Sequence, residues 1–136
     1  MNMKTLALNT FVEFEQPATI NSDENLQNLV RSIASGLDDD LFIVLYTVAA
    51  SNYIGFSVMT PKSGDLTRAA GMANIASQHY ADGALVYHLI VSPRSLMHET
   101  RMMSEIDLTL AEAGINLADY GFIRQGKIHS FTDVKI

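Results

Sequence analysis

The chain of 136 residues contains no cysteine, no tryptophan and only three prolines. Without cysteine there can be no disulfide, thiolate nucleophile, iron–sulfur cluster or cysteine-ligated zinc, so stability must come from packing. Basic residues are also scarce, because nine Lys and Arg stand against fifteen Asp and Glu, a formal net charge of −6. Proteins that bind a phosphate backbone normally carry a surplus of cations. The composition therefore disfavours generic nucleic-acid binding.

What is present suits one folded domain. Hydrophobic residues make up 48% of the sequence and charged residues 18%, which is enough apolar surface for a core and too little charge for a disordered chain. No repeat, low-complexity tract or Pro/Gly-rich linker divides the sequence, so we expect a single α+β domain over residues 1–136. The segment Met1–Lys4 is soon followed by Asn9, Glu13 and Glu15 rather than by the apolar stretch of a signal peptide. A cytoplasmic protein is therefore expected.

An uncharged stretch from Leu41 to Thr60 allows two interpretations. Twenty largely apolar residues are enough to cross a bilayer as a helix. Against a membrane span, Ser51 and Asn52 lie at the centre, and both halves are rich in β-branched and aromatic residues, which favour strands. We therefore expect a β-hairpin of Leu41–Ala50 and Tyr53–Thr60, and no membrane insertion.

Hydrophobic spacing and turn residues predict the other elements. They are a strand at Lys4–Phe14, a helix from Asn21 to Gly36, a helix from Asp65 to the pair Asp82-Gly83, a strand at Ala84–Ser92, a helix capped by Ser92-Pro93 that runs to Ala113, and a hairpin of Tyr120–Arg124 and Lys127–Val134. The first six elements follow the βαββαβ order of a ferredoxin-like sandwich, an antiparallel sheet with helices on one face. The sequence thus predicts that α+β sandwich, extended by a C-terminal helix and β-hairpin.

This fold has a consequence for association. The second and fourth strands of a ferredoxin-like sheet lie at its edges, and here both are almost wholly apolar. Apolar edge strands pair with other chains unless they are covered. The C-terminal hairpin can cover one edge, which leaves the other for a partner. We therefore expect self-association, most simply as a homodimer.

Two of the four histidines are candidates for catalysis. His88 interrupts the apolar run Leu85–Val91, which fits either a core or sheet-face residue hydrogen-bonded to the backbone or a general acid or base beneath a pocket. If His129 faced the same groove, the two imidazoles could act in phosphoester hydrolysis, although neither begins the H-x-S/T motif of two-histidine phosphoesterases. No histidines are paired at i, i+4 or as H-x-H, so neither a sequence-local metal site nor a cofactor is expected.

A candidate anion site lies in the loop before the second helix. Lys62, Ser63 and Gly64 lead to a helix amino terminus, where free amide groups attract anions. Arg94, near the start of the third helix, could join them if the loops are adjacent. The alternative is that a loop side chain caps the helix and that Arg94 is a solvated surface residue.

The third helix offers a candidate partner surface. Met97 and Met102 lie partly off its expected buried stripe, and methionine is common at interaction surfaces. Glu99, Arg101 and Glu105 on the same helix are expected to be solvated i, i+4 neighbours.

The leading hypothesis is a non-enzymatic interaction module that self-associates and binds another protein or a small anionic ligand. The alternative is a small hydrolase or phosphoesterase in which His88 and His129 act with Lys62 or Arg94. The two hypotheses differ in whether those side chains converge in one pocket.

Overall fold

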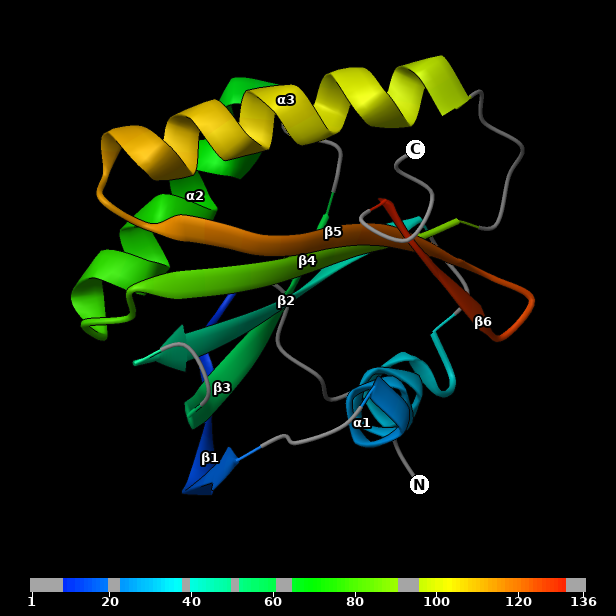
Figure 1. Cartoon of the computed structure of the whole chain (residues 1–136), viewed down its shortest axis with the longest axis horizontal. Coiled ribbons are helices and arrows are strands. Elements are labelled where there is room, and N and C mark those ends of the chain that lie inside the picture. The colour runs from blue at the N-terminus through cyan, green and yellow to red at the C-terminus, as the bar shows by residue number, and fades with distance from the viewer. Residues whose placement is uncertain are drawn as a thin grey trace.

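The computed structural model describes residues 9–19, 23–37, 40–49, 52–60, 65–90 and 96–131. These residues form six strands and three helices (Figure 1). In chain order the elements are β1 (Val12–Thr19), α1 (Asp23–Ala34), β2 (Leu41–Val48), β3 (Asn52–Met59), α2 (Asp65–Gln78), β4 (Gly83–Leu89), α3 (Leu96–Glu112), β5 (Asn116–Arg124) and β6 (Lys127–Ser130).

The strands form one mixed sheet in the order β1-β3-β2-β4-β5-β6. Four of its five neighbouring pairs are antiparallel, and β4 and β5, which α3 connects, are parallel. All seven residues of β4 and the first seven of β2 are buried. Strands that are apolar on both faces belong in the middle of a sheet, where helices cover both sides.

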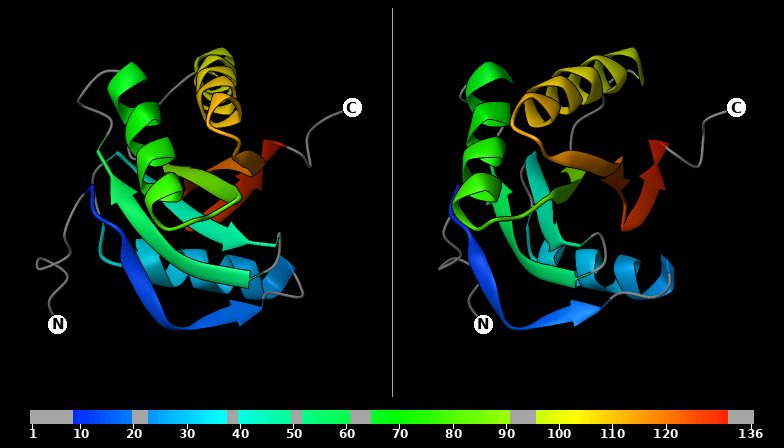
Figure 2. Two further views of the ribbon diagram at one scale, coloured as in Figure 1. Left: turned by 90° about the vertical axis from the view of Figure 1, so that its left-hand side faces the viewer. Right: turned by 60° about the vertical axis from the view of Figure 1, so that its left-hand side comes forward.

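The ferredoxin-like arrangement expected from the sequence is not confirmed. The elements follow the predicted order along the chain, but β2 and β4 are direct neighbours at the centre, and β1 and β6 form the edges. Helices also lie on both faces, with α2 and α3 on one side and α1 on the other (Figure 2). The expected apolar edge strands therefore do not exist, because pairing β2 with β4 buries both of them.

Each face of the sheet has its own core. On the α2/α3 face, alternate residues of the central strands such as Phe42, Val44 and Tyr46 pack against Ile106 and Leu110. On the α1 face, the intervening residues pack against the apolar stripe of α1, which includes Leu26, Leu29, Val30 and Ile33. The predicted periodicity of the first helix is thus confirmed.

Both predicted hairpins are present. Strands β2 and β3 pair antiparallel, and no helix of the described residues is long and apolar enough to cross a membrane. In the second hairpin β5 begins at Asn116, earlier than predicted, and β6 ends at Ser130. Gln125 and Gly126 connect them with φ values of 54° and 78°, the left-handed pair that a tight two-residue hairpin turn needs.

The first strand differs from the prediction. We expected it at Lys4–Phe14, whereas β1 covers Val12–Thr19, and residues 1–8 lie outside the described part. The alternation of β1 is interrupted by an irregularity between Glu13 and Ala18, which includes Pro17. Bulges and proline are typical of edge strands.

A buried tyrosine predicts how stability depends on pH. Burial raises the pKa of the Tyr46 hydroxyl well above its usual value near 10, and the 2.8 Å hydrogen bond with Ser57 offsets only part of this. Below about pH 10 the tyrosine is neutral in both states, whereas above it only the unfolded chain ionises, so stability falls as pH rises. Urea unfolding between pH 7 and 11 should show a smaller fall for Tyr46→Phe than for the wild type.

Tyr80 supplies the control, since it is 87% exposed. Tyr80→Phe should keep the pH dependence of the wild type. An equally steep fall in Tyr46→Phe would show that Tyr46 is not its source.

Candidate functional site

A row of side chains crosses the sheet at the end where β4 finishes. Strand register places Met59, Phe42, His88, Phe122 and His129 opposite one another on β3, β2, β4, β5 and β6. The row contains both candidate catalytic histidines. Because all of its members lie in register, they share the α2/α3 face of the sheet.

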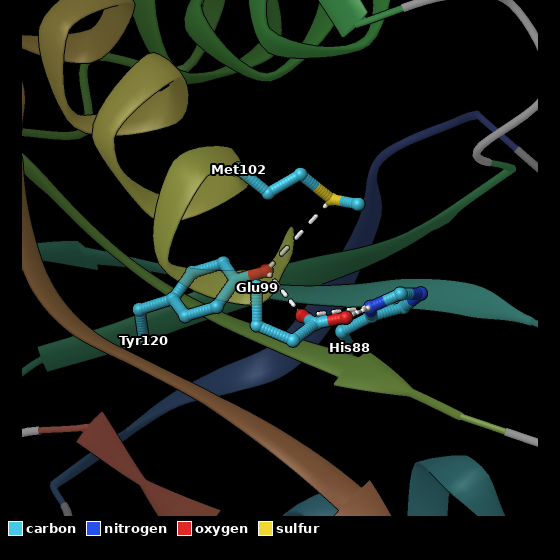
Figure 3. A network of polar contacts seen from close by, with 4 residues as sticks. All are labelled: His88, Glu99, Met102 and Tyr120. Carbon is cyan, nitrogen blue, oxygen red and sulfur yellow. Dashed lines mark hydrogen bonds and ion pairs between the residues drawn. The ribbon is translucent and has the colours of Figure 1, made fainter. Parts of the chain in front are cut away.

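His88 belongs to a buried polar cluster (Figure 3). Its Nδ1 lies 3.0 and 2.9 Å from the two carboxylate oxygens of Glu99, and the Tyr120 hydroxyl donates to Glu99 Oε1 at 3.0 Å. The Tyr120 hydroxyl also lies 4.0 Å from the sulfur of Met102. His88 is 0% exposed and Glu99 is 2% exposed. The Phe42 ring stacks on the imidazole with a centroid distance of 4.3 Å.

The surroundings of Glu99 suit a negative charge. It lies in the first turn of α3, where the helix dipole stabilises anions, and it accepts hydrogen bonds from two other elements. His88 Nε2 is buried without a hydrogen-bond partner among the described residues. A proton there would be an unsatisfied buried donor, so the geometry fits a neutral imidazole that donates from Nδ1 to Glu99.

This arrangement connects elements that are distant in sequence. Glu99 joins α3 to β4 through His88 and to β5 through Tyr120. A carboxylate on Nδ1 is also how catalytic histidines are oriented, with Nε2 left as the base. Here, however, Nε2 is buried, so a substrate has no open approach to His88. The hydrogen bonds of the cluster instead fix α3 on the sheet. Sequence reasoning had placed Glu99 in solvent.

The structure does not bring His88 and His129 together. They lie on β4 and β6 with β5 between them, which separates their backbones by two strand spacings, about 10 Å. The Phe122 side chain fills the intervening position, and its ring stacks on His129 at 4.9 Å. His129 is exposed, whereas His88 is buried.

The remaining predicted site residues divide into two groups. Met102, expected on a partner surface, is only 5% exposed and packs in the core between α3 and the sheet. Lys62, Ser63, Gly64 and Arg94 lie outside the described residues, as does the side chain of Met97. The described part of the chain contains no group of three side chains suited to holding a metal ion.

A second site, which sequence reasoning missed, lies on the C-terminal hairpin. Arg124, Lys127 and His129 are exposed around the half-buried ring of Phe122, and we call these four residues the hairpin surface. The Arg124 guanidinium lies 5.8 Å from the centre of the Phe122 ring, and Arg124 and Lys127 are paired in register. Neither Arg124 nor Lys127 forms an ion pair with another described residue. The feature of the sequence that could have indicated this site is the pair of basic residues, Arg124 and Lys127, on either side of the Gln125-Gly126 turn.

Three hydrogen bonds hold the hairpin in place from the other face. The Ser130 hydroxyl donates to Asp119 Oδ1 at 2.6 Å, and the Tyr87 hydroxyl donates to Oδ2 of the same carboxylate at 2.7 Å, which ties β6 and β5 to β4. At the turn, Arg31 of α1 donates from Nε to the Gly126 carbonyl at 3.0 Å. The hairpin surface is thus supported by the rest of the fold. A scan against protein-family models and a search of curated proteins found no match to this chain.

Proposed function

We propose that this chain is a non-enzymatic interaction module that binds an acidic partner segment at the hairpin surface. The observation that carries the proposal is the pair of exposed cations Arg124 and Lys127 beside Phe122 and His129, neither of which is paired with a described acidic residue. Such a group attracts and orients a negatively charged partner, while the aromatic ring adds contact area. Self-association and a cytoplasmic location are part of the same proposal.

The hydrolase alternative has less support from the geometry. His88 and His129 are separated by Phe122 and differ in exposure, so they do not share a site where one substrate could touch both. The hydrogen bond between His88 and Glu99 lies in the core, where it joins β4 to α3 and needs no catalytic explanation. An interaction module requires only the hairpin surface and no exposed His88.

The proposal predicts binding of an acidic peptide. Deca-glutamate titrated into ¹⁵N-labelled protein at low salt should shift the amide resonances of residues 122–130 most strongly. Exposed charge pairs contribute up to about 1 kcal/mol each, a factor of about five in affinity. Lys127→Glu removes such a pair and adds repulsion, so it should weaken binding about fivefold, and 0.5 M salt should weaken binding by the wild type.

Arg101→Glu is the matched control, because Arg101 is an exposed cation on α3 rather than on the hairpin. It should leave the affinity within about twofold of the wild type. If deca-glutamate shifts no hairpin resonance, or if both variants weaken binding equally, the hairpin surface is not the binding site.

A further inference from the structure

The two edges of the sheet carry opposite charges. On β1, Glu13 and Glu15 are exposed two residues apart, and on β6, Lys127 and His129 are exposed with the same spacing. A two-residue spacing in a regular strand places Lys127 and His129 on one face of β6. One edge therefore presents two exposed carboxylates, and the other presents Lys127 and His129.

Charged residues of both edges lie on the same side of the sheet. Phe14 packs into the core on the α1 face, whereas Glu13 pairs with Gly55, which lies opposite Tyr46, so Glu13 lies on the α2/α3 face. His129 stacks on Phe122 and Ile128 packs into the α1-face core, so Lys127 and His129 also lie on the α2/α3 face. Glu13 thus shares a face with Lys127 and His129 at the opposite edge of the sheet.

The two edge strands also run in the same direction. Crossing the sheet from β1 to β6 passes five neighbouring pairs, of which four are antiparallel and one is parallel. Each antiparallel pair reverses the strand direction, so four reversals leave β6 running in the same direction as β1. A second copy shifted sideways, with its faces kept, would therefore set its β1 parallel to β6 of the first. In that position glutamates lie beside Lys127 and His129.

We infer that the acidic segment bound at the hairpin surface is β1 of a second copy of this chain, which extends the sheet in parallel from β6. This inference rests on the proposed function and names its partner. Symmetric pairing is opposed by charge, since a two-fold axis through either edge places like charges together. Because the contact joins two different edges, its repetition gives a ring or an open row of copies rather than a closed dimer.

Exchange of the charges tests the inference. Sedimentation at about 100 μM protein and low salt should give the wild type an average mass well above the 14.9 kDa monomer. Glu13→Lys with Glu15→Lys should be monomeric, and so should Lys127→Glu with His129→Glu. A mixture of these two variants should associate again, because each supplies the edge that complements the other. That recovery also shows that neither variant has merely lost its fold.

Glu105→Lys with Glu112→Lys, two exposed changes on α3, should associate like the wild type. A monomeric wild type, a mixture that stays monomeric, or a dimer that survives both charge changes would overturn the inference. Binding of deca-glutamate is measured separately on the protein. If it persists while the wild type is monomeric, the hairpin surface still binds acidic segments and only the identity of the partner is wrong.

Discussion

Glu99→Ala is expected to lower the free energy of unfolding by about 3–5 kcal/mol, because two buried donors lose their acceptor and each unsatisfied donor costs about 1–3 kcal/mol. The substitution takes away the carboxylate shared by His88 Nδ1 and the Tyr120 hydroxyl. Nδ1 of His88 then loses its bond to Glu99, and neither ring nitrogen has a hydrogen-bond partner among the described residues. Urea unfolding monitored by circular dichroism at pH 7 measures the loss.

Glu99→Gln and Glu105→Ala provide the comparison. Glutamine keeps the shape and one acceptor oxygen, so its loss should fall between those of the wild type and alanine. Glu105 is an exposed glutamate of the same helix, and its removal should change stability by no more than about 0.5 kcal/mol. A loss below about 1 kcal/mol for Glu99→Ala would contradict the structural role assigned to this cluster.

Gly121→Val should lower the free energy of unfolding by about 3 kcal/mol, the upper end of the range for overpacking. A Cβ atom at Gly121 would overlap the backbone carbonyl oxygen of His129 on β6 and would lie 3.0 Å from Ser130 Cα. Since the obstacle is backbone, it cannot move aside as a side chain would, and β6 must separate from β5. Thermal and urea unfolding measure the stability.

The same substitution should weaken deca-glutamate binding, because the hairpin surface requires both strands. Ala118→Val changes an exposed residue of the same strand and should alter neither stability nor binding appreciably. Full binding by a strongly destabilised Gly121→Val protein would show that β6 is not needed for the surface.

Local patterns predicted the elements well, because helix periodicity and turn chemistry depend on neighbouring residues. The stripe on α1 and the left-handed pair Gln125 and Gly126 are examples. Strand order depends instead on contacts between distant segments, and an element order of βαββαβ is compatible with several sheets. The continuous burial of β2 and β4 was nevertheless informative, since strands apolar on both faces belong at the centre rather than at an edge.

The buried cluster was only half visible in the sequence. His88 stood out because it interrupts an apolar strand, and its 0% exposure agrees with a place in the core. Its hydrogen bond, expected with the backbone, is instead with the Glu99 carboxylate. Glu99 looked like any carboxylate on an amphipathic helix, because its burial depends on β4 and β5, which lie elsewhere in the chain. The hairpin surface was missed for a related reason, since Arg124 and His129 become neighbours of Phe122 only when the hairpin closes.

The hairpin surface exists only while the short strand β6 is paired with β5. Strand β6 has four residues, lies at an edge, and is joined to the rest of the fold by its pairing with β5 and by the Ser130 bond to Asp119. Edge segments of this kind open locally at a lower free energy than the central strands. A partner that recognises only the closed hairpin adds its binding free energy to the cost of opening it. Occupancy of the surface and closure of the hairpin are therefore linked equilibria, so whatever binds there also holds β6 in place.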